Sequence, residues 1–259
     1  MSAEKSSIAT QIEGRTTSIV ARTPWGLCYH NTGSGITDVA VHIRKKDKKT
    51  GKTVRVKRPA ALKTIDVALK IYLASQNGSN GYPWGGPGYV IDHDGTIYQI
   101  AGDNTRTNHV GSVVEGHDRR KQYLSGKWIE LCTPAAVAQW HAHWGPKYKN
   151  SQQLFPSKFP NTDYIGVEMI RCGDGLGKPM RKGLIFTKEQ HEAAVRLAID
   201  VGRRNKFPDG WWRTPRLLGH EDVGLIDRHD KGGGWDPGWL RAEPYFDFEY
   251  VREAISVRW

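Results

Sequence analysis

Two histidines and one aspartate occupy positions that suit chemistry better than packing. His30 ends the apolar run GLCYH, His220 ends RLLGH, and Asp236 follows three consecutive glycines in the segment GGGWDPG. Two imidazoles and one carboxylate form a common ligand set for catalytic zinc, with a fourth position left for water. A histidine at a strand end is also commonly a hydrogen-bonded structural residue, and the spacing matches no compact zinc motif. The spacing alone therefore predicts no more than a metal hydrolase.

A fourth candidate is Glu168, which lies within the run YIGVEMI. This run is apolar on both faces and rich in β-branched residues, which is typical of a central buried strand. A carboxylate in such a strand costs free energy unless it is paired or functional. Glu168 is therefore either a functional group beside the two histidines or a structural residue paired with an arginine.

The segments that carry these residues have the patterns of strands. GLCYH, YIGVEMI and RLLGH are short apolar runs, and GYVIDHDGTIYQIAG predicts a hairpin that turns at Asp94-Gly95.

Helical patterns alternate with these strands. TIDVALKIYLASQNG has apolar residues at helical spacing, Thr133-Pro134 begins a second helix, and Thr187 with Gln190 forms the capping box of a third. The final segment PYFDFEYVREAISVRW predicts a closing helix. The alternation predicts an α/β fold with a single central mixed β-sheet flanked by helices.

Composition limits the classes of partner. The 259 residues carry a formal net charge of +11, and no segment reaches the about 20 apolar residues of a membrane helix. A basic surface favours nucleic acid, anionic lipid or an anionic wall polymer. Much of the excess lies in RKKDKKTGKTVRVKR, which predicts a solvated loop or hairpin. Without a nucleic-acid-binding motif, we expect no nucleic-acid partner.

Cysteines, the amino terminus and a histidine pair give further expectations. Cys28, Cys132 and Cys172 form no C-x-x-C pair, which favours buried thiols over a disulfide framework. The first residues lack the apolar run of a signal peptide, so we expect synthesis in the cytoplasm without a cleaved signal. His141 and His143 are expected to be structural or surface residues.

Several motifs in a fixed order carry a resemblance. The order is YHNT, GYVIDHDGTIYQ, NHVG, IGVE, GHEDV and WDPG. Together they resemble the zinc-dependent N-acetylmuramoyl-L-alanine amidases, a superfamily that includes muropeptide-recycling amidases, phage endolysins and peptidoglycan recognition proteins. The resemblance covers about residues 24–240 and implies that superfamily's fold, with insertions.

The resemblance also implies roles for single residues. His30, His220 and Asp236 would bind one zinc ion, and Glu168 would be the general base that takes a proton from water and passes it to the leaving amine. His109 in NHVG matches a histidine that faces the substrate cleft in many relatives, so it implies substrate or transition-state contact.

The chain departs from its relatives at two positions. Many relatives have a lysine two residues before the third ligand, where this chain has Gly234. Lys231 or Arg228 could instead stabilise the oxyanion. Pro87 stands where some relatives have a catalytic tyrosine, with Tyr82 close by. We expect Tyr82 and Trp235 to contact the substrate as aromatic groups near the cleft.

These expectations describe one amidase domain over residues 1–259, with an extension over 1–23, a core over about 24–240 and a terminal helix over about 241–259. The expected activity is hydrolysis of the amide between N-acetylmuramic acid and L-alanine, as an endolysin or as an antibacterial effector with an immunity partner. The enzyme would act on the cell wall after release or specialised export. The alternatives are a cytoplasmic muropeptide-recycling amidase and a non-catalytic peptidoglycan-binding module.

Overall fold

The computed structural model describes residues 5–12, 22–31, 42–46, 53–57, 65, 68, 69, 72, 86–107, 109, 110, 134–149, 151–157, 160–170, 185–224, 236–241 and 244–259. In this part of the chain, no helix has both the length and the apolar character needed to cross a membrane.

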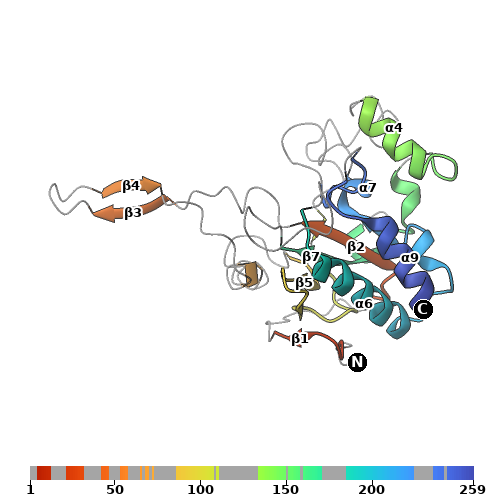
Figure 1. The fold of residues 1–259 in the computed structure, drawn as a ribbon, viewed down its shortest axis with the longest axis horizontal. Helices are drawn as coiled ribbons and strands as arrows, with labels where there is room; N and C mark the ends of the chain where they lie inside the picture. The colour runs from red at the N-terminus through yellow and green to blue at the C-terminus, as the bar shows by residue number, and fades with distance from the viewer. Residues whose placement is uncertain are drawn as a thin grey trace.

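The centre of the fold is a six-stranded mixed sheet with the order β1-β6-β5-β7-β2-β8. Its β5 and β6 form the antiparallel hairpin predicted around Asp94-Gly95, whereas the other neighbouring strands are parallel. The predicted sheet is thereby confirmed (Figure 1). The strands are β1 (Thr10–Gln11), β2 (Gly26–Asn31), β5 (Tyr89–Ile91), β6 (Ile97–Gln99), β7 (Tyr164–Met169) and β8 (Leu217–Gly219).

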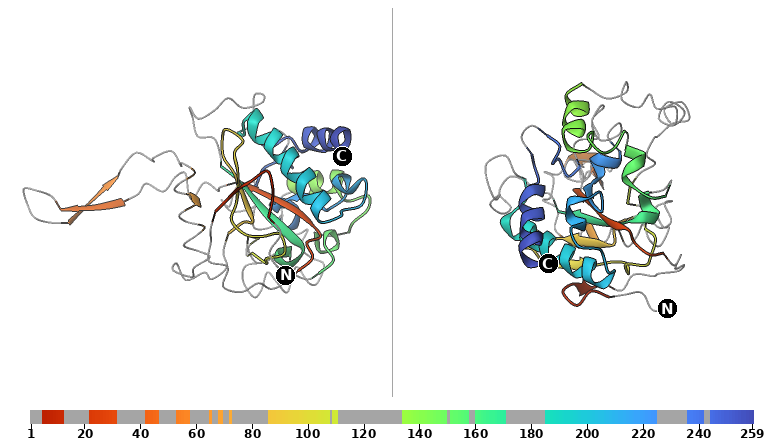
Figure 2. Two further views of the ribbon diagram at one scale, coloured as in Figure 1. Left: turned by 90° about the horizontal axis from the view of Figure 1, so that it is seen from below. Right: turned by 90° about the vertical axis from the view of Figure 1, so that its right-hand side faces the viewer.

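Helices cover the sheet and complete its main apolar core. Helix α6 (Lys188–Arg204) begins at the predicted capping box of Thr187 and Gln190. Helix α9 (Phe248–Arg258) lies beside α6, as Figures 1 and 2 show, and its Phe248, Val251 and Ile255 belong to the core. The other helices are α4 (Pro134–His143), the short α5 (Pro160–Asp163) and α7 (His220–Val223), and the 3-10 turns η2 (Ser151–Leu154) and η3 (Trp211–Arg213).

The basic segment forms a hairpin of its own. Strands β3 (His42–Lys46) and β4 (Thr53–Lys57) pair in antiparallel fashion, apart from the main sheet (Figure 1). Of the predicted helix TIDVALKIYLASQNG, the structure describes four positions, all helical, including Tyr72. Cys28 is a buried free thiol, and the other two cysteines lie outside the described residues.

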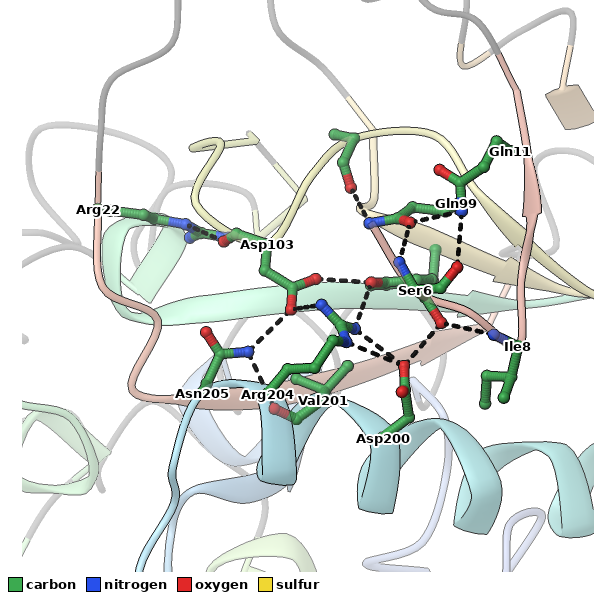
Figure 3. Close-up of polar contacts among 12 residues, drawn as sticks. Ser6, Ile8, Gln11, Arg22, Gln99, Asp103, Asp200, Val201, Arg204 and Asn205 are labelled. Carbon is green, nitrogen blue, oxygen red and sulfur yellow. Dashed lines mark hydrogen bonds and ion pairs between the residues drawn. The ribbon is translucent and has the colours of Figure 1, made fainter. Parts of the chain in front are cut away.

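The amino-terminal segment is tied to the sheet and to α6 by polar contacts (Figure 3). The Ser6 backbone N–H donates to Gln99 Oε1 at 2.7 Å, and the Ser6 hydroxyl donates to Asp200 Oδ2 at 2.6 Å. Arg204 bridges Asp200 and the buried Asp103, so a charged network joins three segments distant in sequence. The described residues of the predicted extension are thus part of the folded body.

Candidate metal centre and active site

The register of three parallel strands brings the predicted residues to one end of the sheet. In this register, His30 of β2 is the partner of Glu168 of β7, and Tyr29 is the partner of Gly219 of β8. His220 follows Gly219 directly, so both histidines and the glutamate meet at the carboxyl ends of the strands. Ligand sites of parallel sheets are commonly found at this edge.

The alternation of side chains decides which face of the sheet holds the site. The hydroxyl of Tyr29 donates to the carbonyl of Ala194 in α6, so Tyr29 faces that helix. Successive side chains of a strand point to opposite faces. His30 therefore faces away from α6, and its register partner Glu168 lies on that same face.

His30, His220 and Asp236 form a buried cluster, each at most 4% exposed. The Asp236 Oδ2 atom lies 2.9 Å from Nδ1 of His220 and 3.5 Å from Nδ1 of His30. One ligand atom from each residue lies within 4.8 Å of the others, so this group could hold a metal ion. Although burial raises the pKa of Asp236, hydrogen bonds and charge from the two histidines hold it well below its usual value. The carboxylate is therefore ionised and ready to bind a cation.

The loop that carries Asp236 is held by Glu221, the residue after His220. The buried Glu221 carboxylate accepts hydrogen bonds at 2.6–3.1 Å from four backbone N–H groups, those of Asp236, Gly238, Trp239 and Leu240. Burial, with Asp222, raises the pKa of Glu221 to about 8, whereas the N–H donors favour the carboxylate. This single side chain fixes the third ligand relative to the second.

Asp222 contacts the same loop through Trp239 and the end of α4 through Trp144. Its carboxylate accepts the indole N–H of Trp144 and of Trp239, each at 2.8 Å, and the backbone N–H of Gly219 at 2.7 Å. A side chain on Gly219 would come within 2.7 Å of Pro237 Cδ, so the glycine allows the strand end and the Asp236 loop to pack together. Glu221 and Asp222 stand in the motif GHED, but sequence reasoning assigned them no role.

Glu168 alone among the residues of β7 is partly exposed. Tyr72, only 7% exposed, donates a side-chain hydrogen bond to it. Burial raises the pKa of Tyr72, and the charges of Glu168 and Asp236 raise it further, so the hydroxyl stays protonated. Sequence reasoning missed this residue because Tyr72 fits the apolar stripe of its helix.

His109 lies behind His30. Its Nδ1 is 2.9 Å from Nε2 of His30, and its Nε2 is 2.9 Å from the carbonyl oxygen of Tyr164. Burial and the neighbouring His30 lower the pKa of His109 well below its usual value, so the ring is neutral. Both ring nitrogens therefore have partners within the protein, and the substrate contact predicted for His109 stays a prediction.

A second group of metal-binding atoms shares one histidine with the first. Cys28, His30 and His109 also bring one ligand atom each within 4.8 Å of one another. Cys28 and His30 lie two residues apart on β2 and so on the same face.

Other predicted site residues fall where the structure gives no description. Lys231, its alternative Arg228, Tyr82 and Trp235 all lie outside the described residues, and their predicted roles stay predictions. His141 and His143 lie on α4 outside the cluster, and His143 contacts Arg252 at 3.1 Å and packs against the ring of Trp239.

Glu221→Gln is predicted to loosen the Asp236 loop. The variant replaces an acceptor oxygen by an amide N–H that faces backbone donors, so the free energy of unfolding should fall by about 2–4 kcal/mol. Urea unfolding of the metal-free chain measures this change. The matched control is Glu189→Gln on the exposed first turn of α6, which should change stability by less than about 0.5 kcal/mol. Equal stability of the two variants would contradict this role of Glu221.

Comparisons with known proteins add to this geometry. Two solved structures are similar to the chain: N-acetylmuramoyl-L-alanine amidase LysC from Clostridium intestinale URNW, and the endolysine N-acetylmuramoyl-L-alanine amidase LysCS from the same organism. The first is 14% identical, with 94% of this chain and 95% of that chain covered and a TM-score of 0.40. The second is 15% identical, with 96% and 97% covered and a TM-score of 0.41. Among curated proteins, none matches significantly.

A family match covers the whole of the site. The model of the family described as N-acetylmuramoyl-L-alanine amidase matches residues 21–239. This range includes His30, Glu168, His220 and Asp236 and spans most of the 259 residues. The chain therefore belongs to the N-acetylmuramoyl-L-alanine amidase family.

Proposed function

We propose that this amidase uses one zinc ion, held by His30, His220 and Asp236, to hydrolyse the amide between the lactyl group of N-acetylmuramic acid and L-alanine. The observation that carries the proposal is the buried cluster of these three residues beside Glu168 at one sheet edge.

The donor set fits zinc. Two neutral imidazoles and one carboxylate are typical of catalytic zinc sites, which keep a further position open. A site built only of oxygen ligands would instead favour magnesium or calcium. The ionised Asp236 lowers the net charge of a bound dication. Zinc in such a site supplies a Lewis acid, which polarises a carbonyl and makes water a stronger acid.

Glu168 is the group that moves the proton. As register partner of His30, it lies on the same face of the sheet as that ligand. Its carboxylate can accept a proton from the attacking water and then donate this proton to the departing amine of L-alanine. The hydroxyl of Tyr72, which donates to this carboxylate, orients it and favours its charged form.

The developing oxyanion needs a cation or an N–H donor as well. Lys231 stays the predicted cation, because it lies in the chain between His220 and Asp236. Retention of all three ligands and of Glu168 supports an enzyme over a non-catalytic binding module.

We infer that polymeric cell-wall peptidoglycan is the substrate, as for an endolysin or an antibacterial effector. The formal net charge of +11 supports this inference, because a basic protein is attracted to anionic wall polymers. Action on the wall would follow release from the cytoplasm or specialised export, and an effector would require an immunity protein. A recycling amidase would act on soluble muropeptides instead.

Digestion of purified sacculi by the zinc-loaded chain tests the proposed function. Mass spectrometry should find free stem peptides with L-alanine at the amino terminus, and a chelator should abolish their release. Glu168→Gln should keep zinc but lose at least about 100-fold in rate, because the base is gone. The control Glu189→Gln should retain the wild-type rate.

The outcomes separate the alternatives. Full activity of Glu168→Gln would refute the assigned base, and release unaffected by the chelator would refute the metal dependence. Intact sacculi with cleavage of soluble muropeptides would favour the recycling enzyme. Intact sacculi and intact muropeptides would favour the binding module.

Tyr72→Phe is predicted to lower kcat about tenfold and leave zinc affinity unchanged. Loss of the hydroxyl donor disfavours the charged form of Glu168, which raises the pKa of that carboxyl. Since the base works only when deprotonated, the acidic limb of the pH–rate profile should move to higher pH. The matched control is Tyr250→Phe, which removes a hydroxyl that donates to Glu192 outside the site. An unchanged acidic limb in Tyr72→Phe would contradict the role.

A further inference from the structure

His109 lies between a predicted zinc ligand and a backbone carbonyl, with both contacts at 2.9 Å. We propose that His109 is a positioning residue that fixes His30 in the tautomer with its proton on Nε2, so that the Nδ1 lone pair of His30 faces the metal. The role rests on the proposed zinc centre, but it concerns the orientation of one ligand rather than the reaction.

The direction of the two hydrogen bonds follows from chemistry. The carbonyl oxygen of Tyr164 can only accept, so Nε2 of His109 must carry the proton. Nδ1 of His30 lies on the side of the cluster, 3.5 Å from Asp236 Oδ2, and Nε2 lies on the side of His109. When Nδ1 binds the metal, the neutral His30 keeps its proton on Nε2, which then donates to Nδ1 of His109.

The carbonyl oxygen of Tyr164 accepts a second hydrogen bond, from Arg22. Arg22 donates through one guanidinium nitrogen to the carbonyl of Tyr164 at 2.7 Å and to that of Asn161 at 2.6 Å. The carbonyl oxygen of Tyr164 therefore links Arg22, in the segment before β2, to His109 and through His109 to His30.

The position of the His109 ring is fixed from two sides. The side-chain oxygen of Asn161 accepts the backbone N–H of His109 at 3.0 Å and that of Val110 at 2.8 Å, and its amide nitrogen donates to the carbonyl of Val110 at 2.7 Å. On the other side, a Cβ on Gly166 would come within 2.3 Å of His109 Cγ. The glycine of the motif IGVE is therefore required by the close approach of this ring.

The contact between the two histidines is 2.9 Å long, which is the usual length of an N–H···N hydrogen bond. Ligand histidines commonly use their second ring nitrogen in such an outer contact, which sets the tautomer.

The test compares His109→Phe and His109→Gln with His191→Phe in the full chain. His191 is a suitable control because it is also buried and bonded through both ring nitrogens, to the carbonyl of Thr187 and the N–H of Asp247, outside the site. Zinc affinity, measured by competition with a chromophoric chelator, should fall about 10–100-fold in His109→Phe. It should fall less in His109→Gln, whose amide can replace one of the two bonds, and stay unchanged in His191→Phe.

Nitrogen-15 NMR of the zinc-loaded chain shows which ring nitrogen of His30 carries the proton. In the wild type this should be Nε2, and in His109→Phe a second signal should appear from His30 with its proton on Nδ1. A wild-type His30 with its proton on Nδ1 would overturn the proposal. If the phenylalanine variant does not fold, the glutamine variant decides the comparison.

The remaining outcomes separate this role from the zinc centre. Wild-type zinc affinity in His109→Phe would overturn the role of His109 alone, whereas a wild-type chain that binds no zinc would overturn the zinc centre with it. Cys28→Ser should leave zinc affinity unchanged, and loss of zinc in that variant would show that His109 is a ligand of the Cys28 group instead.

Discussion

The parallel register of β8, β2 and β7 is the constraint on which the rest of the site depends. It makes His30 the neighbour of Glu168 and places His220 directly beyond the residue paired with Tyr29. A shift of one residue in β2 would turn His30 toward α6 and remove it from the other ligands. The apolar side chains that alternate with the functional ones, such as Tyr29 and Val167, are completely buried and so specify this register.

Two buried carboxylates position the Asp236 loop, as the strand register positions His30 and Glu168. Glu221 and Asp222 are completely buried, which is costly for charged groups unless donors surround them. The donors are the backbone of the Asp236 loop and the indoles of Trp144 and Trp239. The cost of burial is thus offset only when the loop is folded against α7, and the third metal ligand is then in place.

Much of this arrangement follows from local sequence patterns. The apolar runs that end in His30 and before His220 predict β2 and β8, and a carboxylate in an apolar strand marks Glu168. The contacts of Tyr72, His109 and Glu221 could not be predicted in this way, because each depends on residues brought together only by the tertiary fold. Tyr72 follows a helical apolar pattern, yet its hydroxyl reaches a strand 96 positions further along the chain. Glu221 contacts backbone N–H groups, which leave no signature in the residue types of the loop.

X-ray absorption at the zinc K-edge of the full chain tests most directly whether His30, His220 and Asp236 hold the metal. Zinc held by these three residues should have nitrogen and oxygen neighbours only, at about 2.0–2.2 Å, with two imidazoles in the wild type and one in His220→Ala. A sulfur neighbour at about 2.3 Å would contradict this assignment, because zinc would then lie on Cys28 and not in the cluster formed with Asp236.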